Sequence, residues 1–283
     1  MRKPVIAILA FIVSLSLLYP ALVPMSRAFA TAPSTVSAQV ISVFDGDTIR
    51  VRLSTGVEET VRMIGIDTPE VARDGNPAEP FSAEATALAQ TRLGGRTVFL
   101  EIGARSRDAF DRLLAYVWVE QPLNTTEAEI RAKMFQAEIL LRGYAEILAI
   151  EPNIKYIGPF VNSFEREART LRRGIWSLVA PTGMVVASLD LIAEVVTVTN
   201  QGSTSRDISR WVLFSDIGDQ TYTFPRGTVV PAGGSIRVVS GSRATAGPGQ
   251  LVWTRSYMWS NSGDLAVLRN NAGNVICRLW RAP

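Results

Sequence analysis

The sequence predicts two folded domains, a first one that mixes strands with helices and a second one built of strands alone. The chain has 283 residues, more than one domain usually contains. Up to Ser177, apolar residues recur at both strand and helix spacing. From Leu178 onward the helical spacing disappears, and short runs of Val, Ile, Leu, Thr and Trp are separated by glycines. We therefore expect a mixed domain followed by a β-sandwich.

The first thirty residues are predicted to belong to neither domain. Basic residues precede an apolar run at 5–19, and Ala-Phe-Ala at 28–30 forms a small-x-small cleavage site. This order is typical of a signal peptide, so we expect export and a mature chain that begins at Thr31. The protein would then be secreted, periplasmic or attached to the cell envelope. The alternative is an uncleaved membrane tether, since the apolar segment 5–23 is nearly long enough to span a bilayer.

Without the expected signal peptide, the net charge of the chain gives no sign of a polyanionic partner. The chain carries 29 basic and 26 acidic residues, and Arg2, Lys3 and Arg27 account for the excess. Any contact with nucleic acid must therefore be local. The absence of histidine excludes a histidine base, a histidine-bound zinc and a Ser-His-Asp triad. The single cysteine, Cys277, excludes an intrachain disulfide.

A predicted hairpin brings two aspartates together near the start of the first domain. Apolar and polar residues alternate over 49–53, a turn is expected at 54–56, and a second strand is expected over 61–66. The turn returns the second strand antiparallel to the first. Asp47, just before the first strand, is thereby placed near Asp67, just after the second.

Asp47 and Asp67 are candidate metal ligands. Two carboxylates in a partly buried place repel each other unless a proton or a cation lies between them. Oxygen ligands with no histidine or thiolate nearby favour a hard cation, Ca²⁺ or Mg²⁺. Thr68 is expected to add its backbone carbonyl, whose direction is fixed because Pro69 keeps the preceding residue extended.

Two more residues complete a hydrolytic set. Glu70 lies just beyond the ligands, in position to activate a water molecule. Arg62 presents a planar fork of donors that matches two oxygens of a phosphate. A metal, an arginine and a free carboxylate are the parts of a phosphodiester hydrolase. Asp-Gly-Asp alone is a common turn and Thr-Pro-Glu alone a common helix start, so the interpretation depends on their ordered combination.

The motifs Asp-Gly-Asp-Thr at 45–48 and Ile-Asp-Thr-Pro-Glu at 66–70 resemble those of the staphylococcal-nuclease-like, or thermonuclease, family. The resemblance covers about 40–177 and ends in Gly-Ile-Trp-Ser. It implies that domain 31–177 is an OB-fold, a five-stranded β-barrel with helices. The site residues it implies are Asp47, Asp67 and Thr68 as calcium ligands, Asp45 as an acid behind them, Arg62 and Arg112 as phosphate-binding arginines, and Glu70 as the general base.

Arg112 comes from the stretch Asp-Arg-Leu-Leu-Ala-Tyr at 111–116, which is similar to the family's second arginine motif. Two segments depart from the family. Residues 122–132 insert a polar, acidic piece before the next helix, and Ala149 and Glu151 occupy positions where relatives often carry tyrosines that stack on the substrate. The candidates to replace those tyrosines are Phe110, Tyr144, Tyr156 and Phe160.

The remaining elements of the first domain follow from periodicity and turn residues. A polar loop is expected at 71–81, at the mouth of the site, and a helix capped by Ser82 is expected to end at Gly94 and Gly95. We expect strands at 97–102 and 113–119, and a closing helix at 163–173.

The second domain, 184–283, follows a short linker at 178–183. Its expected strands are 189–200, 211–215, 221–224, 236–240, 265–269 and 275–280. Stretches such as Tyr-Thr-Phe-Pro-Arg-Gly-Thr-Val-Val-Pro-Ala-Gly-Gly-Ser resemble the lamin-tail domain, an immunoglobulin-like sandwich. Its carboxylates are scattered, so we expect no second active site.

These observations predict an exported, calcium-dependent nuclease that hydrolyses the phosphodiester bonds of DNA and RNA. The family resemblance implies in-line attack by water that leaves a 3′-phosphate. The alternative is an inert or secondary nuclease barrel in a protein that binds the cell envelope or matrix. The partner of the sandwich stays open between nucleic acid, protein and cell envelope. Because every predicted catalytic residue precedes Leu178, we expect the first domain to act on short substrates without the second.

Overall fold

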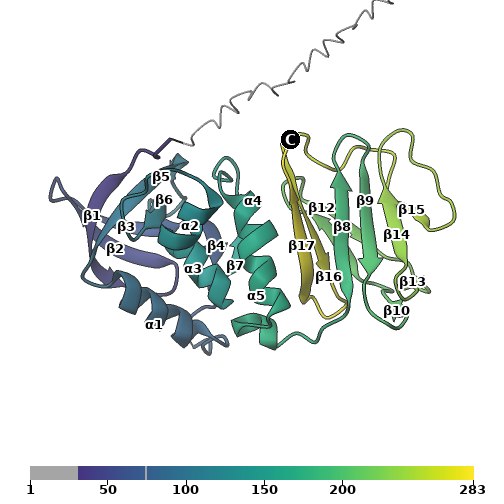
Figure 1. Cartoon of the computed structure of the whole chain (residues 1–283), viewed down its shortest axis with the longest axis horizontal. Helices are drawn as coiled ribbons and strands as arrows, with labels where there is room; N and C mark the ends of the chain where they lie inside the picture. Colours follow the sequence, from purple (N-terminus) through teal and green to yellow (C-terminus); the bar gives the residue numbers. More distant parts are fainter. Residues whose placement is uncertain (1–30, 74) are drawn as a thin grey trace, which may run out of the picture.

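The structure is a computed structural model that describes residues 31–73 and 75–283, and the expected signal peptide at 1–30 lies outside them. Figure 1 shows a barrel with its helices beside a strand-only domain, joined by a short connection after the last helices. Within the described ranges, no helix is both long and apolar enough to cross a bilayer.

Five strands close into the predicted barrel, in the order β1-β2-β3-β6-β5. β3 and β6 run parallel, and every other neighbouring pair in the barrel runs antiparallel. Alternate side chains such as Ile49, Val51 and Val61 are fully buried, as the period of two predicts. The strand bounds are β1 Val36–Val43, β2 Thr48–Leu53, β3 Glu58–Met63, β5 Thr97–Arg107 and β6 Leu113–Trp118.

The expected strand 61–66 is wrong in its second half. The chain leaves the barrel at Gly65, which has a φ of 83°. A Cβ at this position would lie only 3.0 Å from the ring of Phe160, so glycine also makes room for that ring. β4 (Gly65–Asp67) then pairs antiparallel with β7 (Glu146–Leu148). Asp67 is thereby fixed on a small two-stranded sheet beside the barrel.

Helix α1 (Ser82–Leu93) packs against the barrel through Ala85, Ala89 and Leu93, which recur every fourth residue and are fully buried. The prediction that Ser82 caps this helix is wrong by one residue. Phe81, with a φ of 71°, precedes the helix, and Ser82 is its buried first residue. The helix ends before Gly94, as predicted.

The inserted segment 122–132 extends the loop after β6 and then forms most of a separate short helix, α2 (Glu127–Lys133). Thr126 caps this helix by accepting a hydrogen bond from the backbone N–H of Glu129. The expected closing helix 163–173 is split into shorter pieces. The helices are α2 Glu127–Lys133, α3 Phe135–Arg142, α4 Ile157–Pro159, the π-helix η1 Phe160–Glu165, α5 Arg166–Thr170 and the 3₁₀-helix η2 Gly174–Ser177.

The second domain is the predicted sandwich, with one sheet in the order β12-β11-β16-β17 and the other in the order β15-β14-β9-β8. The expected strand 189–200 is two strands, because Asp190 accepts two backbone N–H groups and turns the chain. The bounds are β8 Met184–Asp190, β9 Val195–Asn200, β10 Arg206–Asp207, β11 Val212–Ser215, β12 Gln220–Thr223, β13 Val229–Val230, β14 Ser235–Val239, β15 Gln250–Val252, β16 Asp264–Arg269 and β17 Val275–Arg281.

The two domains share a hydrophobic core. Leu265, Val267 and Val275 of the sandwich belong to the same buried cluster as the barrel and its helices. The side chain of Asn162 in η1 donates to the carbonyl of Trp280 at 3.0 Å and accepts from its N–H at 3.1 Å. In Figure 1, β17 lies along the side of α4 and α5. The contact is therefore part of the fold rather than a flexible tether.

Candidate active site

Asp47 is placed by a tight turn between β1 and β2. The carboxylate of Asp45 accepts the backbone N–H of Asp47 at 3.0 Å and that of Thr48 at 2.7 Å, so Asp45 builds the turn. Gly46 lets the turn approach its neighbours, because a Cβ there would lie 2.7 Å from the Thr68 side chain and 2.8 Å from that of Ala85. This explains why the motif reads Asp-Gly-Asp-Thr.

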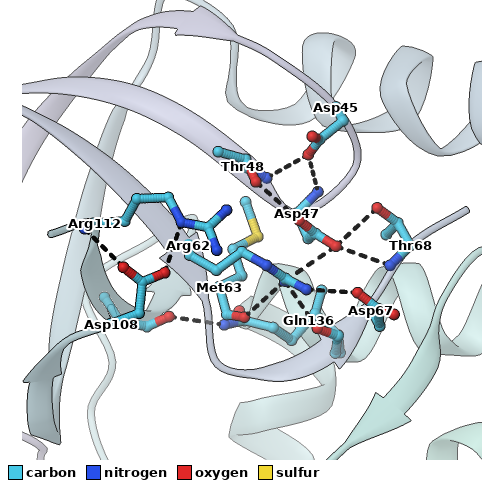
Figure 2. A network of polar contacts seen from close by, with 12 residues as sticks. Asp45, Asp47, Thr48, Arg62, Met63, Asp67, Thr68, Asp108, Arg112 and Gln136 are labelled. Atoms are coloured by element: carbon cyan, nitrogen blue, oxygen red, sulfur yellow. Dashed lines mark hydrogen bonds and ion pairs between the residues drawn. The ribbon is translucent and has the colours of Figure 1, made fainter. Parts of the chain in front are cut away.

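The Asp47 carboxylate is buried and points at the residues that follow β4 (Figure 2). Its Oδ2 accepts the backbone N–H of Thr68 at 2.8 Å and the Thr68 hydroxyl at 2.9 Å. Its Oδ1 accepts the hydroxyl of Thr48 at 3.0 Å. The predicted meeting of the two motifs is therefore present, although twenty-one positions separate Asp47 from Thr68.

Arg62, near the end of β3, lies between the two candidate ligand carboxylates. Nη1 is 3.0 Å from Asp47 Oδ2, and Nη2 is 2.6 Å from Asp67 Oδ1. Nη1 also donates to the carbonyl of Ile66 at 2.9 Å. The guanidinium is thus the cation that the two carboxylates share in the structure, and both its position and its orientation are fixed (Figure 2).

Burial disfavours the charge on both aspartates. It raises the pKa of Asp47 to about 6, although Arg62 and the hydrogen bonds from Thr68 favour the ionised form. Burial also raises the pKa of Asp67, against the attraction of Arg62, and the charges of Glu146 and Glu79 add to the rise. A site that concentrates negative charge in a desolvated place favours a multivalent cation.

The donor set fits a hard cation. Among the described residues, no group of three or more His, Cys, Asp and Glu side chains is placed to hold a metal ion, so a cation bound by Asp47 and Asp67 would need backbone carbonyls or water as further ligands. Both of these side chains are carboxylates, and the predicted third ligand, the carbonyl of Thr68, belongs to the buried residue that follows Asp67. An all-oxygen set of this kind suits Ca²⁺ or Mg²⁺ rather than zinc.

Glu70, the predicted base, is exposed at the start of the loop that precedes α1. Its backbone N–H donates to Glu79 Oε2 at 2.9 Å, and the N–H of Glu79 donates to the carbonyl of Glu70 at 2.9 Å. These two bonds close the loop 70–79 into a hairpin-like unit. Glu79 was missed by sequence reasoning, since only the fold shows that a residue of the predicted polar loop returns to the motif.

Arg112, just before β6, is oriented by Asp108. The Asp108 carboxylate accepts the Arg112 Nε–H at 2.7 Å and the Arg112 backbone N–H at 2.9 Å (Figure 2). Burial alone would raise the pKa of Asp108. The hydrogen bonds from the side chain and backbone of Arg112 lower this pKa, and together with that from Phe110 they outweigh burial, so the net shift is downward. Asp108 was also missed, although its place four residues before an arginine in a turn was a usable signal.

Arg62 and Arg112 line one cavity of about 300 Å³. The parallel pairing of β3 with β6, in which Val61 faces Leu113, brings the two arginines to the same edge of the barrel. Leu148 and Ile150 add apolar side chains to the cavity wall. The cavity thus places the two predicted phosphate-binding arginines beside an apolar surface.

The structure separates the four aromatic candidates for base stacking. Tyr156 and Phe160 are buried in the core, and Tyr144 stacks on Phe81 with ring centroids 6.0 Å apart. Phe110 is 81% exposed at the cavity edge, and the guanidinium of Arg112 lies 5.4 Å from its ring centre. Phe110 is therefore the aromatic ring that a substrate can reach.

A closed five-stranded barrel that gathers two arginines, a carboxylate pair and an exposed glutamate at one edge defines a phosphodiester hydrolase. Comparison with known proteins agrees. Residues 60–178 match the family model described as staphylococcal nuclease homologue, and residues 178–280 match the lamin tail domain. The chain belongs to the staphylococcal nuclease family, is a nuclease, and carries a lamin tail domain after the nuclease domain.

Three relatives illustrate the match. The thermonuclease of Staphylococcus hyicus is 33% identical over 139 residues, which span 49% of this chain and 75% of that protein. The thermonuclease of Staphylococcus intermedius is 31% identical over 134 residues, or 47% and 72%. Endonuclease Htp3 of Saprolegnia parasitica is 32% identical over 205 residues, or 61% and 90%.

Proposed function

We propose that this protein is an exported, calcium-dependent nuclease that hydrolyses both DNA and RNA. One observation carries the proposal: Asp47 and Asp67, from opposite ends of the predicted hairpin, meet at a single guanidinium with separations of 3.0 and 2.6 Å. Two carboxylates bound to an arginine that lines the cavity can hold a cation next to a phosphate.

Asp47, Asp67 and the carbonyl of Thr68 are the groups that would hold calcium. When bound, the cation supplies positive charge beside the phosphate that reacts. Arg62 is held at the end of β3 by two backbone carbonyls, so its charge is positioned before substrate arrives. An all-oxygen set suits calcium or magnesium, and the family resemblance implies calcium.

The remaining residues divide the chemistry between them. Arg112, fixed by Asp108, binds a second phosphate oxygen and neutralises charge that develops as water attacks. Glu70 is exposed and accepts the proton of the attacking water. The phosphodiester bond to the 5′-oxygen breaks, and the phosphate stays on the 3′-side, as the family resemblance implies.

Recognition of both DNA and RNA follows from the cavity. Phe110, Leu148 and Ile150 present apolar surface to the base, and stacking or apolar contact does not depend on the base or on a 2′-hydroxyl. The arginines contact phosphate, which the two polymers share. Export follows from the predicted signal peptide at 1–30.

The test uses protein beginning at Thr31, incubated with single-stranded DNA, double-stranded DNA and RNA. We expect all three to be cut in calcium, products that carry a 3′-phosphate, and no cutting by Asp47→Asn. Binding without cutting, in calcium and at high enzyme concentration, would instead identify an inert barrel in a binding protein. Cutting by Asp47→Asn at the wild-type rate would place the chemistry elsewhere.

A further inference from the structure

An arginine of the sandwich reaches into the nuclease domain. Arg278 lies in β17, and its side chain is 4% exposed. One side of its guanidinium pairs with Glu165 of η1, and Nη2 lies 2.7 Å from Oε2 of Glu146 in β7. The lamin tail domain therefore supplies a buried cation to two carboxylates of the nuclease domain.

Glu146 lies directly across from a candidate metal ligand. In the antiparallel pair β4–β7, Glu146 and Asp67 are register partners. Side chains at such positions project from the same face with Cβ atoms about 5 Å apart, and like charges there repel. Each carboxylate is bound by a different arginine, Asp67 by Arg62 of the barrel and Glu146 by Arg278 of the sandwich.

The bond to Glu146 has little to do with holding the domains together. Glu165 is fully buried, so it requires partners in the fold, and Arg278 provides one beside Arg169, whose Nη2 lies 3.4 Å from Glu165 Oε2. The Glu146 side chain is 42% exposed, and an ion pair of that exposure adds little to stability. What the bond does achieve is to fix the Glu146 carboxylate toward the sandwich and offset its charge beside Asp67.

We propose that Arg278 is a positioning residue of the nuclease site, which restrains Glu146 so that Asp67 and the substrate phosphate are not opposed by a free carboxylate. The proposal rests on the function proposed above. It gives the lamin tail domain a role in hydrolysis itself, because the guanidinium that completes the surroundings of Asp67 comes from β17. An unrestrained Glu146 would push against Asp67 and repel a polyanionic substrate.

The test is a double-mutant cycle in the full-length chain, with kcat/KM on single-stranded DNA measured at saturating calcium. Arg278→Met should lower kcat/KM by about tenfold or more, the size of effect seen when the surroundings of a metal ligand are disturbed. Glu146→Gln should stay within about twofold of wild type, since it removes the carboxylate that Arg278 restrains. The double variant should recover to within about threefold of wild type, because no free carboxylate remains.

A purely structural role gives a different pattern, because replacing Glu146 cannot restore the lost partner of Glu165. Equal kcat/KM for Arg278→Met and the double variant, or a wild-type value for Arg278→Met, would overturn the proposal. Arg281→Met, at the exposed end of the same strand, is the matched control and should behave as wild type.

If Arg278→Met does not fold, the comparison is repeated in a background that carries both Arg278→Met and Glu165→Gln. The second substitution removes the buried carboxylate that Arg278 neutralises in the wild type. Adding Glu146→Gln to that background should raise kcat/KM by about tenfold, and no rise would overturn the proposal. If the wild-type protein cuts DNA but adding Glu146→Gln does not raise kcat/KM, only the positioning role of Arg278 is rejected. Wild-type protein with no calcium-dependent cutting rejects the proposed function and the positioning role together.

Discussion

Replacing Asp47 with asparagine should stabilise the calcium-free protein while abolishing its activity. The pKa of Asp47 is raised from its ordinary 3.8 to about 6, chiefly by burial. Such a shift corresponds to about 3 kcal/mol of preference for the neutral carboxyl in the fold. Asparagine fits the same bonds, since its oxygen can accept from Thr68 and its amide can donate to the hydroxyl of Thr48. Because this shift already includes the attraction of Arg62, a gain of up to about 3 kcal/mol is expected at pH 7.

The sign of the pH dependence follows from the same shift. Because the folded protein binds the Asp47 proton more tightly than the unfolded chain does, this residue makes stability fall as pH rises from about 4 to about 6. Urea unfolding in chelator at pH 4.5 and pH 7 measures the effect. Wild type should lose stability over that range, and Asp47→Asn should lose less. Asp67→Asn is the contrast, because its side chain is 55% exposed and its stability effect should be smaller.

Calcium should reverse the order of stability. At a calcium concentration one hundred times its dissociation constant, binding stabilises wild type by about 2.7 kcal/mol, whereas a variant that lost a ligand gains far less. The reasoning would be refuted if Asp47→Asn were less stable than wild type in chelator, or if both proteins gained equally from calcium.

Three further predictions test other parts of the account. Arg62→Ala and Arg112→Ala should each lower the hydrolysis rate by about 10² in a steady-state assay, and normal turnover in both would indicate another site. Deleting residues 178–283 should expose the shared core and remove the Arg278 partner of the buried Glu165, leaving only Arg169 at 3.4 Å, so the truncated domain should unfold at lower urea than the whole chain; an unchanged midpoint would show that the domains are independent. Mass spectrometry of the exported protein should place its N-terminus at Thr31, and a mass that retains the apolar segment would indicate a membrane tether.

The barrel and the sandwich were predictable because periodicity and turn residues act locally. Alternating side chains such as Ile49 and Val51 give β2, and Gly94 ends α1. The split of the expected strand at Gly65 was not predictable, because its cause is the ring of Phe160, almost a hundred positions away. Local pattern also could not show that the expected closing helix would begin within the π-helix η1 and continue as α5.

In the candidate site, too, local features were predictable from the sequence and contacts between distant residues were not. The motifs predicted the meeting of Asp47 with the residues after β4, since a hairpin fixes both ends at once. Glu79 could not be predicted because its bond to the backbone of Glu70 exists only in the folded chain, whereas the spacing of Asp108 from Arg112 was a local signal. The contacts of Arg278 with Glu146 and Glu165 were also not predictable, because these partners lie more than a hundred positions earlier in the chain.

The measurement that tests the central claim most directly is a calcium titration of DNA hydrolysis by the wild-type protein, starting from a chelated sample. The account predicts no cutting in chelator, a saturable rise in rate as calcium is added, and little rise at any calcium concentration in Asp67→Asn. Full hydrolysis in excess chelator, or the same calcium curve for wild type and Asp67→Asn, would contradict it.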